Sequence, residues 1–449
     1  MAKKYPDGNV LYRKLQWEYP VIEKGEGVYL YDESGKQYLD ATGGPMLINI
    51  GHGVPEIADA LAEQARKVAY IHGTQFTTRC IEEFAREFAE VLPGDIDRIY
   101  LLAGGSEANE AAFKLAVQYQ GYTGNPRKYR LVGRWMSFHG CTLGTLSMGA
   151  RPNERKFYEP LVITSFPHTV PCYCYRCPLG KTYPQCNVDC AWDLERVVKL
   201  ERAETIAAYM AETISGTSLG AAVPPKEYYP IIRQICDKYN ILFIADEVMC
   251  GMGRTGKWFA IEHWGVVPDM ITAGKGASGG YVPIGVMATT SKVVDTLKQK
   301  DASFTHGHSY TNTPMTAACA NAVLRYIKKH DLIQQSADRG EYLRKKLETL
   351  YEFPFVGDVR GLGSMRAIEF VQDKQTKAPF PRSMKFVEKM YKKVFDKGVI
   401  IFTGNGCADG VDGDLIMVSP PFIITEAQID HVVDVLRESF KEVQQELKK

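Results

Sequence analysis

The sequence predicts an α/β fold built around a large, mostly parallel β-sheet. Short apolar runs recur through the middle of the chain, and longer amphipathic stretches separate them, which is the order expected when helices cross between parallel strands. The seven predicted strands lie at residues 98–103, 129–134, 161–164, 207–211, 241–245, 270–273 and 284–289. We therefore expect one seven-stranded sheet with helices packed against it.

Both ends of the chain predict a smaller α+β domain. Residues 28–41 alternate apolar and polar side chains on either side of Ser34 and Gly35, which is typical of a β-hairpin. Toward the other end, helical patterns cover residues 317–330 and 337–350, strand-like residues follow at 356–371, and a helix at 426–449 closes the chain. We place the two parts of the small domain at residues 1–60 and 331–449, and the large domain at residues 61–330.

Composition and charge exclude several classes of function. The 449 residues include 54 Lys and Arg against 53 Asp and Glu, so a dedicated nucleic-acid or membrane-surface role is disfavoured. A hydrophobic content of 45% is typical of a globular protein. The first residues are charged, and no apolar window is long enough to cross a bilayer. These features predict a cytoplasmic protein that binds neither nucleic acid nor membrane.

Two polar residues follow neighbouring predicted strands. Asp246 comes directly after residues 241–245, and Lys275 follows residues 270–273. Ligand crevices of open α/β sheets lie at the carboxyl ends of strands, so both side chains are expected in one crevice. Glycines surround Lys275, and a desolvated lysine is a nucleophile toward aldehydes. A solvated loop lysine is the alternative for this residue taken alone.

Two further turns could bind a flat, phosphorylated ligand. Gly104, Gly105 and Ser106 stand between a predicted strand and a predicted helix, where backbone N–H groups and the helix dipole favour a phosphate. A tight turn without a ligand explains the glycines equally well. Phe138 and His139 follow another strand and supply an aromatic face for stacking.

Five motifs in order carry a family resemblance. They are GGSEAN, FHG, ADEVMCGMGRTG, GKGASGGYVPIG and FTHGHSYTNTP. Together they resemble the class III pyridoxal-phosphate aminotransferases, and the match extends over most of the chain. The resemblance implies pyridoxal 5'-phosphate (PLP) as cofactor, PLP fold type I, and a homodimer with a shared active site.

The resemblance also implies roles for single residues. Lys275 would form the internal aldimine and shuttle a proton, and Asp246 would pair with the pyridine nitrogen so that the ring acts as an electron sink. Glu212 would lie near the hydroxyl edge of the cofactor, although Thr213 replaces the usual Pro. The other cofactor-binding residues would be Gly105 and Ser106 at the phosphate, Phe138 and His139 on one ring face, Val248 on the other, and His308 and Ser309.

His308 and Ser309 lie in the segment HGHSYTN. In the family, this segment reaches across the dimer interface and gives a Thr to the neighbour's phosphate. Ser309 stands at the matching position, beside His308. An ordinary polar connection is the alternative for this loop.

Five of the eleven cysteines lie between Cys172 and Cys190. Cys174 and Cys177 form a C-x-x-C pair, and Cys186 and Cys190 form a looser C-x-x-x-C pair. Four thiolates in two pairs could bind zinc or an iron–sulfur cluster. A redox-labile pair and packed free thiols remain open as alternatives.

The substrate is the least determined feature. The resemblance implies that Met46 faces the substrate, and it implies an Arg for the substrate carboxylate where this chain has Gly410; Arg366 and Arg79 are possible substitutes. We expect transfer of an amino group from an amine, ω-amino acid or amino acid to a 2-oxo acid, pyruvate or 2-oxoglutarate, in a ping-pong cycle through the Lys275 aldimine. An amino-acid racemase or epimerase on the same fold, or a metal-bound structural protein, are the alternatives.

Overall fold

The computed structural model describes residues 9–448, and its centre is a sheet of eight strands. The strand order is β4-β11-β10-β9-β8-β5-β6, and β7 also pairs with β5. β11 runs antiparallel to β4 and β10, whereas the remaining pairs are parallel. The strands are β4 (Ile96–Leu102), β5 (Arg130–Trp135), β6 (Gly149–Ala150), β7 (His168–Thr169), β8 (Ile206–Glu212), β9 (Leu242–Asp246), β10 (Met270–Gly274) and β11 (Gly285–Thr290). The predicted large, mostly parallel sheet is confirmed.

One of the seven predicted strands is wrong. Leu161 ends a short 3-10 helix, η1 (Glu159–Leu161), and residues 162–164 form no strand. The backbone N–H of Ile163 donates to the side-chain Oγ of Ser147 at 2.8 Å, so a side chain takes the place of a strand partner. The two-residue strands β6 and β7 extend the sheet instead.

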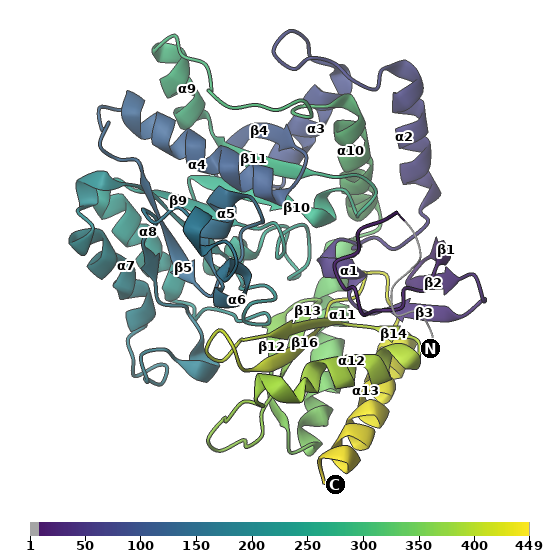
Figure 1. The fold of residues 1–449 in the computed structure, drawn as a ribbon. Coiled ribbons are helices and arrows are strands. Elements are labelled where there is room, and N and C mark those ends of the chain that lie inside the picture. Colours follow the sequence, from purple (N-terminus) through teal and green to yellow (C-terminus); the bar gives the residue numbers. More distant parts are fainter. Residues whose placement is uncertain (1–8, 449) are drawn as a thin grey trace.

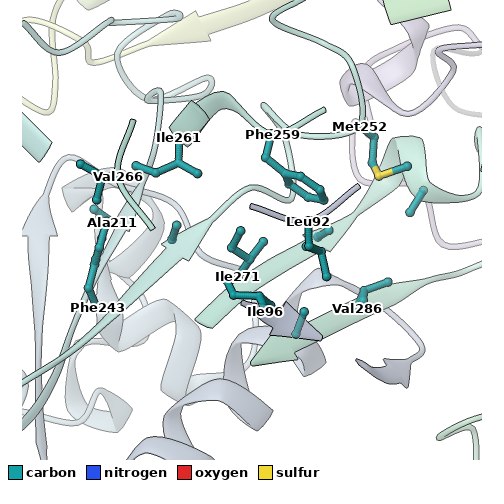
Figure 2. Close-up of a cluster of buried hydrophobic side chains, with 14 of the residues drawn as sticks. Leu92, Ile96, Ala211, Phe243, Met252, Phe259, Ile261, Val266, Ile271 and Val286 are labelled. Atoms are coloured by element: carbon teal, nitrogen blue, oxygen red, sulfur yellow. The ribbon is translucent and has the colours of Figure 1, made fainter. Parts of the chain in front are cut away.

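Helices cover both faces of this sheet. Successive side chains along a strand point alternately into two hydrophobic cores, one on each face. Tyr209 and Ala211 of β8 belong to one buried cluster, and Ala208 and Met210 belong to another. Figure 2 shows part of the first cluster, with Phe243, Phe259 and Ile271 among its members. The first cluster includes residues of α2 (Pro55–Lys67), α3 (Arg79–Ala89), α7 (Asp189–Leu200), α8 (Tyr228–Tyr239) and α10 (Pro314–Lys329); the second includes α4 (Gly105–Tyr122) and α9 (Ser291–Gln299).

The two chain ends meet in smaller sheets, as predicted (Figure 1). The N-terminal hairpin is confirmed, and β14 pairs with its second strand in the order β1-β2-β3-β14. The strands are β1 (Ile22–Glu26), β2 (Tyr29–Asp32), β3 (Gln37–Asp40) and β14 (Val399–Ile400). One buried cluster contains Leu39 from the first part and Leu436 from the last helix, so the ends share a core.

A C-terminal sheet has the order β12-β13-β16-β15. It consists of β12 (Val356–Leu362), β13 (Met365–Phe370), β15 (Phe402–Asn405) and β16 (Asp414–Val418), with helices α11 (Leu332–Glu348), α12 (Phe386–Asp396) and α13 (Glu426–Leu447). The short helices are α1 (Gly43–Met46), α5 (Leu143–Met148) and α6 (Pro152–Arg155). The domain bounds at residues 60 and 330 stay a prediction.

Among the described residues, no helix has both the length and the apolar character needed to span a membrane. The cytoplasmic location stays a prediction.

Candidate active site

Three neighbouring parallel strands end at the same edge of the large sheet, and each carries a charged side chain there. Glu212 at the end of β8 is in register with Asp246 at the end of β9. Thr272 of β10 is in register with the same aspartate, and Lys275 follows three residues later, directly after Gly274. The register therefore brings Glu212, Asp246 and Lys275 to one edge, the position that open α/β sheets use for ligands.

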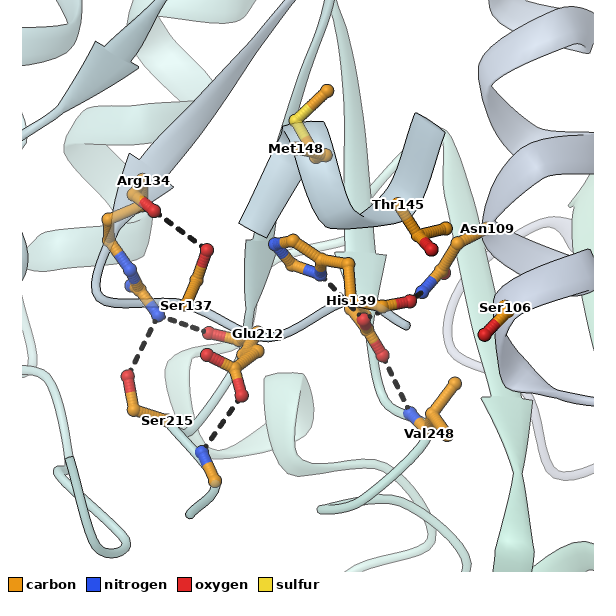
Figure 3. A network of polar contacts seen from close by, with 12 residues as sticks. Ser106, Asn109, Arg134, Ser137, His139, Thr145, Met148, Glu212, Ser215 and Val248 are labelled. Atoms are coloured by element: carbon orange, nitrogen blue, oxygen red, sulfur yellow. Dashed lines mark hydrogen bonds and ion pairs between the residues drawn. The ribbon is translucent and has the colours of Figure 1, made fainter. Parts of the chain in front are cut away.

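Asp246 is held in a buried hydrogen-bond network, and only 4% of its surface is exposed. Its Oδ2 accepts a hydrogen bond from Nδ2 of Asn109 at 2.9 Å and lies 2.7 Å from Nδ1 of His139. Its Oδ1 accepts from the backbone N–H of Val248 at 3.0 Å. Figure 3 shows His139, Asn109 and Val248 converging on this point from three different elements. These contacts fix the carboxylate in one orientation.

Lys275 stands in a short helical turn, η5 (Lys275–Ala277), with a backbone φ of 44°. A left-handed φ is uncommon for a residue with a side chain, and such residues cluster at functional sites. Burial lowers the pKa of the Lys275 ammonium to about 8, and the charges of Asp246 and Glu212 only partly oppose this. A far larger share of this amine is therefore neutral, and able to act as a nucleophile, than for an ordinary lysine.

The glycine-rich turn before α4 lies against the lysine strand. A Cβ on Gly105 would lie 2.7 Å from Cγ1 of Val248, so only glycine fits there. The Cβ position of Gly274 is 3.8 Å from the backbone N of Gly105. Ser106 Oγ accepts a hydrogen bond from the N–H of Cys141 at 3.1 Å, which joins this turn to the turn that follows β5. The first N–H groups of an eighteen-residue helix thus face the same edge as Lys275.

Glu212 has one oxygen satisfied and one buried without a hydrogen-bond partner among the described residues. Oε1 accepts from the N–H of Gly216 at 3.0 Å, whereas Oε2 is buried and unpaired. Burial raises the pKa of this carboxyl group. Nε2 of His139 is likewise buried and unpaired among the described residues. Buried polar atoms normally have partners, so these two atoms indicate a place for a polar ligand.

Phe138 and Val248 lie in the same region as the network. Phe138 is partly buried and directly precedes His139 in the turn after β5. Val248 is partly buried and contacts the Cβ position of Gly105. The structure therefore brings together eight of the predicted residues, namely Gly105, Ser106, Phe138, His139, Glu212, Asp246, Val248 and Lys275.

His308 and Ser309 lie on a loop beside the edge strand β4. Nδ1 of His308 accepts from the N–H of Tyr310 at 3.3 Å, and Ser309 is exposed. The loop is attached to β4 because Asn312 exchanges hydrogen bonds with the backbone N–H and C=O of Leu101. Within one chain, the structure does not bring Ser309 into the network around Asp246.

The predicted substrate residues have different surroundings. Met46 is 1% exposed and packs in a cluster with Ile214, Cys250 and Met417 rather than at an open surface. Arg366 donates to the backbone oxygens of Gly363 and Gly361 and is buried, which makes it a structural residue. Arg79, at the start of α3, is exposed.

Gly410 has a structural reason to be a glycine. Its φ is 94°, and a Cβ there would lie 2.6 Å from Cγ of Pro152 in α6. A side chain at this position therefore meets both backbone strain and a proline ring. The carboxylate-binding arginine that the resemblance implied is excluded from this loop conformation.

The cysteine segment shows no assembled metal centre. Among the described residues, no three His, Cys, Asp or Glu side chains are placed to hold one metal ion. The suggestion that Cys174, Cys177, Cys186 and Cys190 bind zinc or an iron–sulfur cluster stays a prediction.

Sequence reasoning missed Asn109. Its side chain donates to both Asp246 Oδ2 and the backbone oxygen of His139, at 2.9 and 2.7 Å. Sequence reasoning also assigned His139 only to the face of the cofactor ring, whereas His139 contacts the carboxylate of Asp246. The helical spacing offered a signal, because Asn109 follows Ser106 by three residues and so shares its helix face.

Comparison with known proteins agrees with this arrangement. The family model described as Aminotransferase class-III matches residues 13–440. The chain is 36% identical over 438 residues to an uncharacterized aminotransferase of Bacillus subtilis, covering 97% of this chain and 98% of the relative. It is 33% identical over 428 residues to a putrescine–pyruvate aminotransferase of Pseudomonas aeruginosa, covering 93% of this chain and 89% of the relative.

Solved structures give the same result. An (S)-enantioselective omega-transaminase from Thermomicrobium roseum has a TM-score of 0.89 and 34% identity, with 98% of this chain and 96% of that chain covered. The fold is that of the transaminases, enzymes that transfer amino groups. The chain belongs to the class III aminotransferases, a PLP-dependent family.

Proposed function

We propose that this enzyme transfers an amino group from an amine or ω-amino acid to a 2-oxo acid, with Lys275 as the central residue. The observation that carries the proposal is the meeting of Lys275, Asp246 and Glu212 at the ends of three adjacent parallel strands, beside a helix N-terminus. A charged lysine is costly to bury, so its place among carboxylates needs a functional reason.

The residues present fit PLP. Ser106 and the first N–H groups of α4 offer donors for a phosphate, and the carboxylate of Asp246 can hold a proton on the pyridine nitrogen. The unpaired Oε2 of Glu212 and Nε2 of His139 supply polar partners for the edge of the ring. Phe138 and Val248 would lie on its two faces. When bound, PLP supplies an aldehyde and a ring that withdraws electrons from the substrate.

Lys275 is suited to moving a proton. Because its pKa is about 8, its Nζ can both accept and return a proton near neutral pH. Asn109 and His139 orient Asp246 through hydrogen bonds of 2.9 and 2.7 Å, so the carboxylate stays aligned while Lys275 acts. The two groups therefore have different roles: the Asp246 carboxylate supplies a fixed negative charge, and Lys275 transfers the proton.

The proposal includes a homodimer in which each chain completes the other's site. Ser309 is exposed on a loop next to β4, the strand that leads into the Gly105 turn. A hydroxyl in this position is free to reach a phosphate in a second chain. His308 would set the loop's conformation through its hydrogen bond to Tyr310.

The substrate assignment follows from the relatives and from Gly410. Similar proteins are a putrescine–pyruvate aminotransferase and an omega-transaminase, so we propose an amine without an α-carboxylate as donor and pyruvate as acceptor. The lack of room for an arginine at Gly410 favours such donors. Amino-acid racemisation stays the second candidate, because the arginine that the family uses for the carboxylate of the amino acceptor is missing and a racemase needs no acceptor.

The test uses the purified holoenzyme with putrescine or a monoamine and pyruvate, and alanine is measured over time. We expect alanine formation in the wild type and its loss in Lys275→Ala, with Lys292→Ala, an exposed lysine of α9, as matched control. Incubation with one enantiomer of alanine and no amine measures racemisation. Racemisation without transfer would replace the first candidate by the second, and full transfer by Lys275→Ala would overturn the assignment of the lysine.

A further inference from the structure

One segment outside the proposed active site combines reactive thiols with contacts to two parts of the fold. Residues 171–190, here named the cysteine strap, run from the region of β7 to the start of α7. Arg176 Nε donates to Oε1 of buried Glu369 in β13 at 2.5 Å, and Lys377 Nζ donates to the backbone oxygen of Tyr175 at 2.7 Å. The cysteine strap is therefore attached both to the large sheet and to the C-terminal sheet.

Two thiols at the ends of the cysteine strap are already in contact. The Sγ atoms of Cys172 and Cys190 lie 3.7 Å apart, although the residues are separated by 18 positions in the chain. Cys172 is buried at 2% exposure, and Cys190, in the first turn of α7, is partly buried. A disulfide has an S–S distance of about 2.05 Å, so bond formation needs only a small approach of the two side chains.

The surroundings of Cys172 and Cys190 shift the pKa values of the two thiols in opposite directions. Contact with Cys172 lowers the pKa of the Cys190 thiol, and contacts with Cys174 and then Cys190 raise the pKa of Cys172. Thus Cys190 is the thiolate of the pair, and the N-terminal end of a helix favours that charge. A small hollow of about 20 Å³ is lined by Cys174, Cys177, Cys186 and Cys190, which gives a small oxidant access to Cys190.

We propose that Cys172 and Cys190 form a reversible disulfide when a peroxide oxidises the protein. The Cys190 thiolate attacks the peroxide: an S–O bond forms, the O–O bond breaks, and the leaving oxygen takes a proton as water. Cys172 then attacks the Cys190 sulfur: an S–S bond forms, the S–O bond breaks, and the second oxygen leaves as water with the proton of Cys172. Two thiols lose two electrons, and with hydrogen peroxide as oxidant two waters form.

The bond would stabilise the contact between the cysteine strap and the loop that follows Glu212. Tyr173, next to Cys172, packs with Leu219 and Ala222 of that loop. Arg360 of β12 donates both to the Tyr173 hydroxyl at 3.0 Å and to the backbone oxygen of Leu219. Oxidation therefore closes a covalent ring at the point where the cysteine strap, the Glu212 loop and the C-terminal sheet meet.

The position of Lys181 makes the proposal directly testable. Lys181 is exposed and lies between the two cysteines in sequence, so trypsin can cut the cysteine strap inside the proposed ring. The holoenzyme is treated with hydrogen peroxide, free thiols are blocked, and the protein is nicked with trypsin and run in denaturing gels. We expect the two fragments to stay joined without reductant and to separate with dithiothreitol. Peptide mass analysis should find Cys172 linked to Cys190, about 2 Da lighter than the two thiols.

Variants give the controls. Cys190→Ser should abolish the joined fragments, and Cys172→Ala provides a second test should that variant fold poorly. Cys174→Ser is the matched control: Cys174 is exposed and its pKa is lowered to about 7, chiefly by contact with Cys172, yet the bond should form without it. The proposal is overturned when fragments separate without reductant at peroxide doses that oxidise Cys174, or when Cys172 pairs with Cys174 instead. Near one equivalent of bound metal per chain, with these thiols protected, would also overturn it.

Discussion

Lys275, the residue proposed to act in catalysis, weakens the fold that holds it. The ordinary pKa of its ammonium is 10.5, and burial lowers it to about 8. In the cofactor-free protein the folded chain must therefore carry a poorly solvated charge at neutral pH. Between pH 8 and 10.5 the Lys275 amine is mostly protonated in the unfolded chain and mostly neutral in the folded chain. The cost in folding stability is therefore fully present below pH 8 and disappears as the pH rises toward 10.5.

We expect Lys275→Met to stabilise the cofactor-free protein by about 1–3 kcal/mol at pH 7, because methionine fills similar space without charge. Urea unfolding at pH 7, 8, 9 and 10 measures the difference, which should shrink as the pH rises. Lys292→Met, at an exposed position of α9, should show no such trend. A variant that is less stable than wild type at pH 7 would contradict the buried charge.

Asp246 accepts hydrogen bonds at both carboxylate oxygens, and an asparagine in its place keeps only one acceptor oxygen and no charge. We expect Asp246→Asn to retain cofactor through the phosphate site while turnover falls by about 100-fold or more, because a preorganised charge is lost. Initial rates and bound cofactor, measured by absorbance, check both parts. Asp295→Asn, whose side chain lies on the solvent side of α9 and is 51% exposed, serves as the control. Turnover equal to that of the wild type would mean that another carboxylate faces the pyridine nitrogen.

At the scale of elements, the turn between β4 and α4 depends on close packing. Gly105 has no room for a Cβ beside Val248, and Ser106 links the turn to Cys141 after β5. The two turns therefore move together. Any displacement of Val248 also shifts the N–H that holds Asp246.

We expect Gly105→Ala to weaken cofactor binding by about 10-fold or more, because overpacking of about 1–3 kcal/mol acts on the site itself. Gly121→Ala, in the same helix with open space around it, is the matched control and should bind cofactor normally with equal or higher stability. Equilibrium dialysis against PLP measures the affinity. Unchanged affinity in Gly105→Ala would remove this turn from the phosphate site.

At the scale of the whole molecule, the loop with Ser309 would link cofactor binding to assembly in the proposed dimer. If each chain completes the other's phosphate site, cofactor and dimerisation stabilise one another. Large apolar side chains such as Phe157 and Phe76 are exposed in the single chain, at 82% and 65%, and a second chain would cover such groups.

We expect Ser309→Glu to reduce activity strongly, because a carboxylate would repel the partner's phosphate. Mixing it with inactive Lys275→Ala and exchanging subunits should restore part of the activity, since one site in each mixed dimer then has both residues intact. Activity assays with light scattering measure the result. A fully active monomer, or no recovery despite mixed dimers, would contradict the shared site.

Local sequence patterns predict much of the secondary structure of this protein. Six of the predicted strands, the hairpin at residues 28–41 and the strand-end positions of Asp246 and Lys275 follow from apolar periodicity and glycine turns, which are properties of short segments. Residues 161–164 failed as a strand because three apolar residues followed by a Thr do not distinguish a strand from a loop, and Leu161 and Ile163 are exposed.

Tertiary structure alone decided which groups touch. Asn109, His139 and Val248 converge on Asp246 from separate elements, and Cys172 meets Cys190 across an intervening loop. The unpaired oxygen of Glu212 and the proline against Gly410 likewise exist only after packing. The sequence by itself determined the fold class, the family and the strand-end residues, because these depend on local order along the chain. Partners, burial and pKa depend on segments far apart in sequence, and only their packing brings them together.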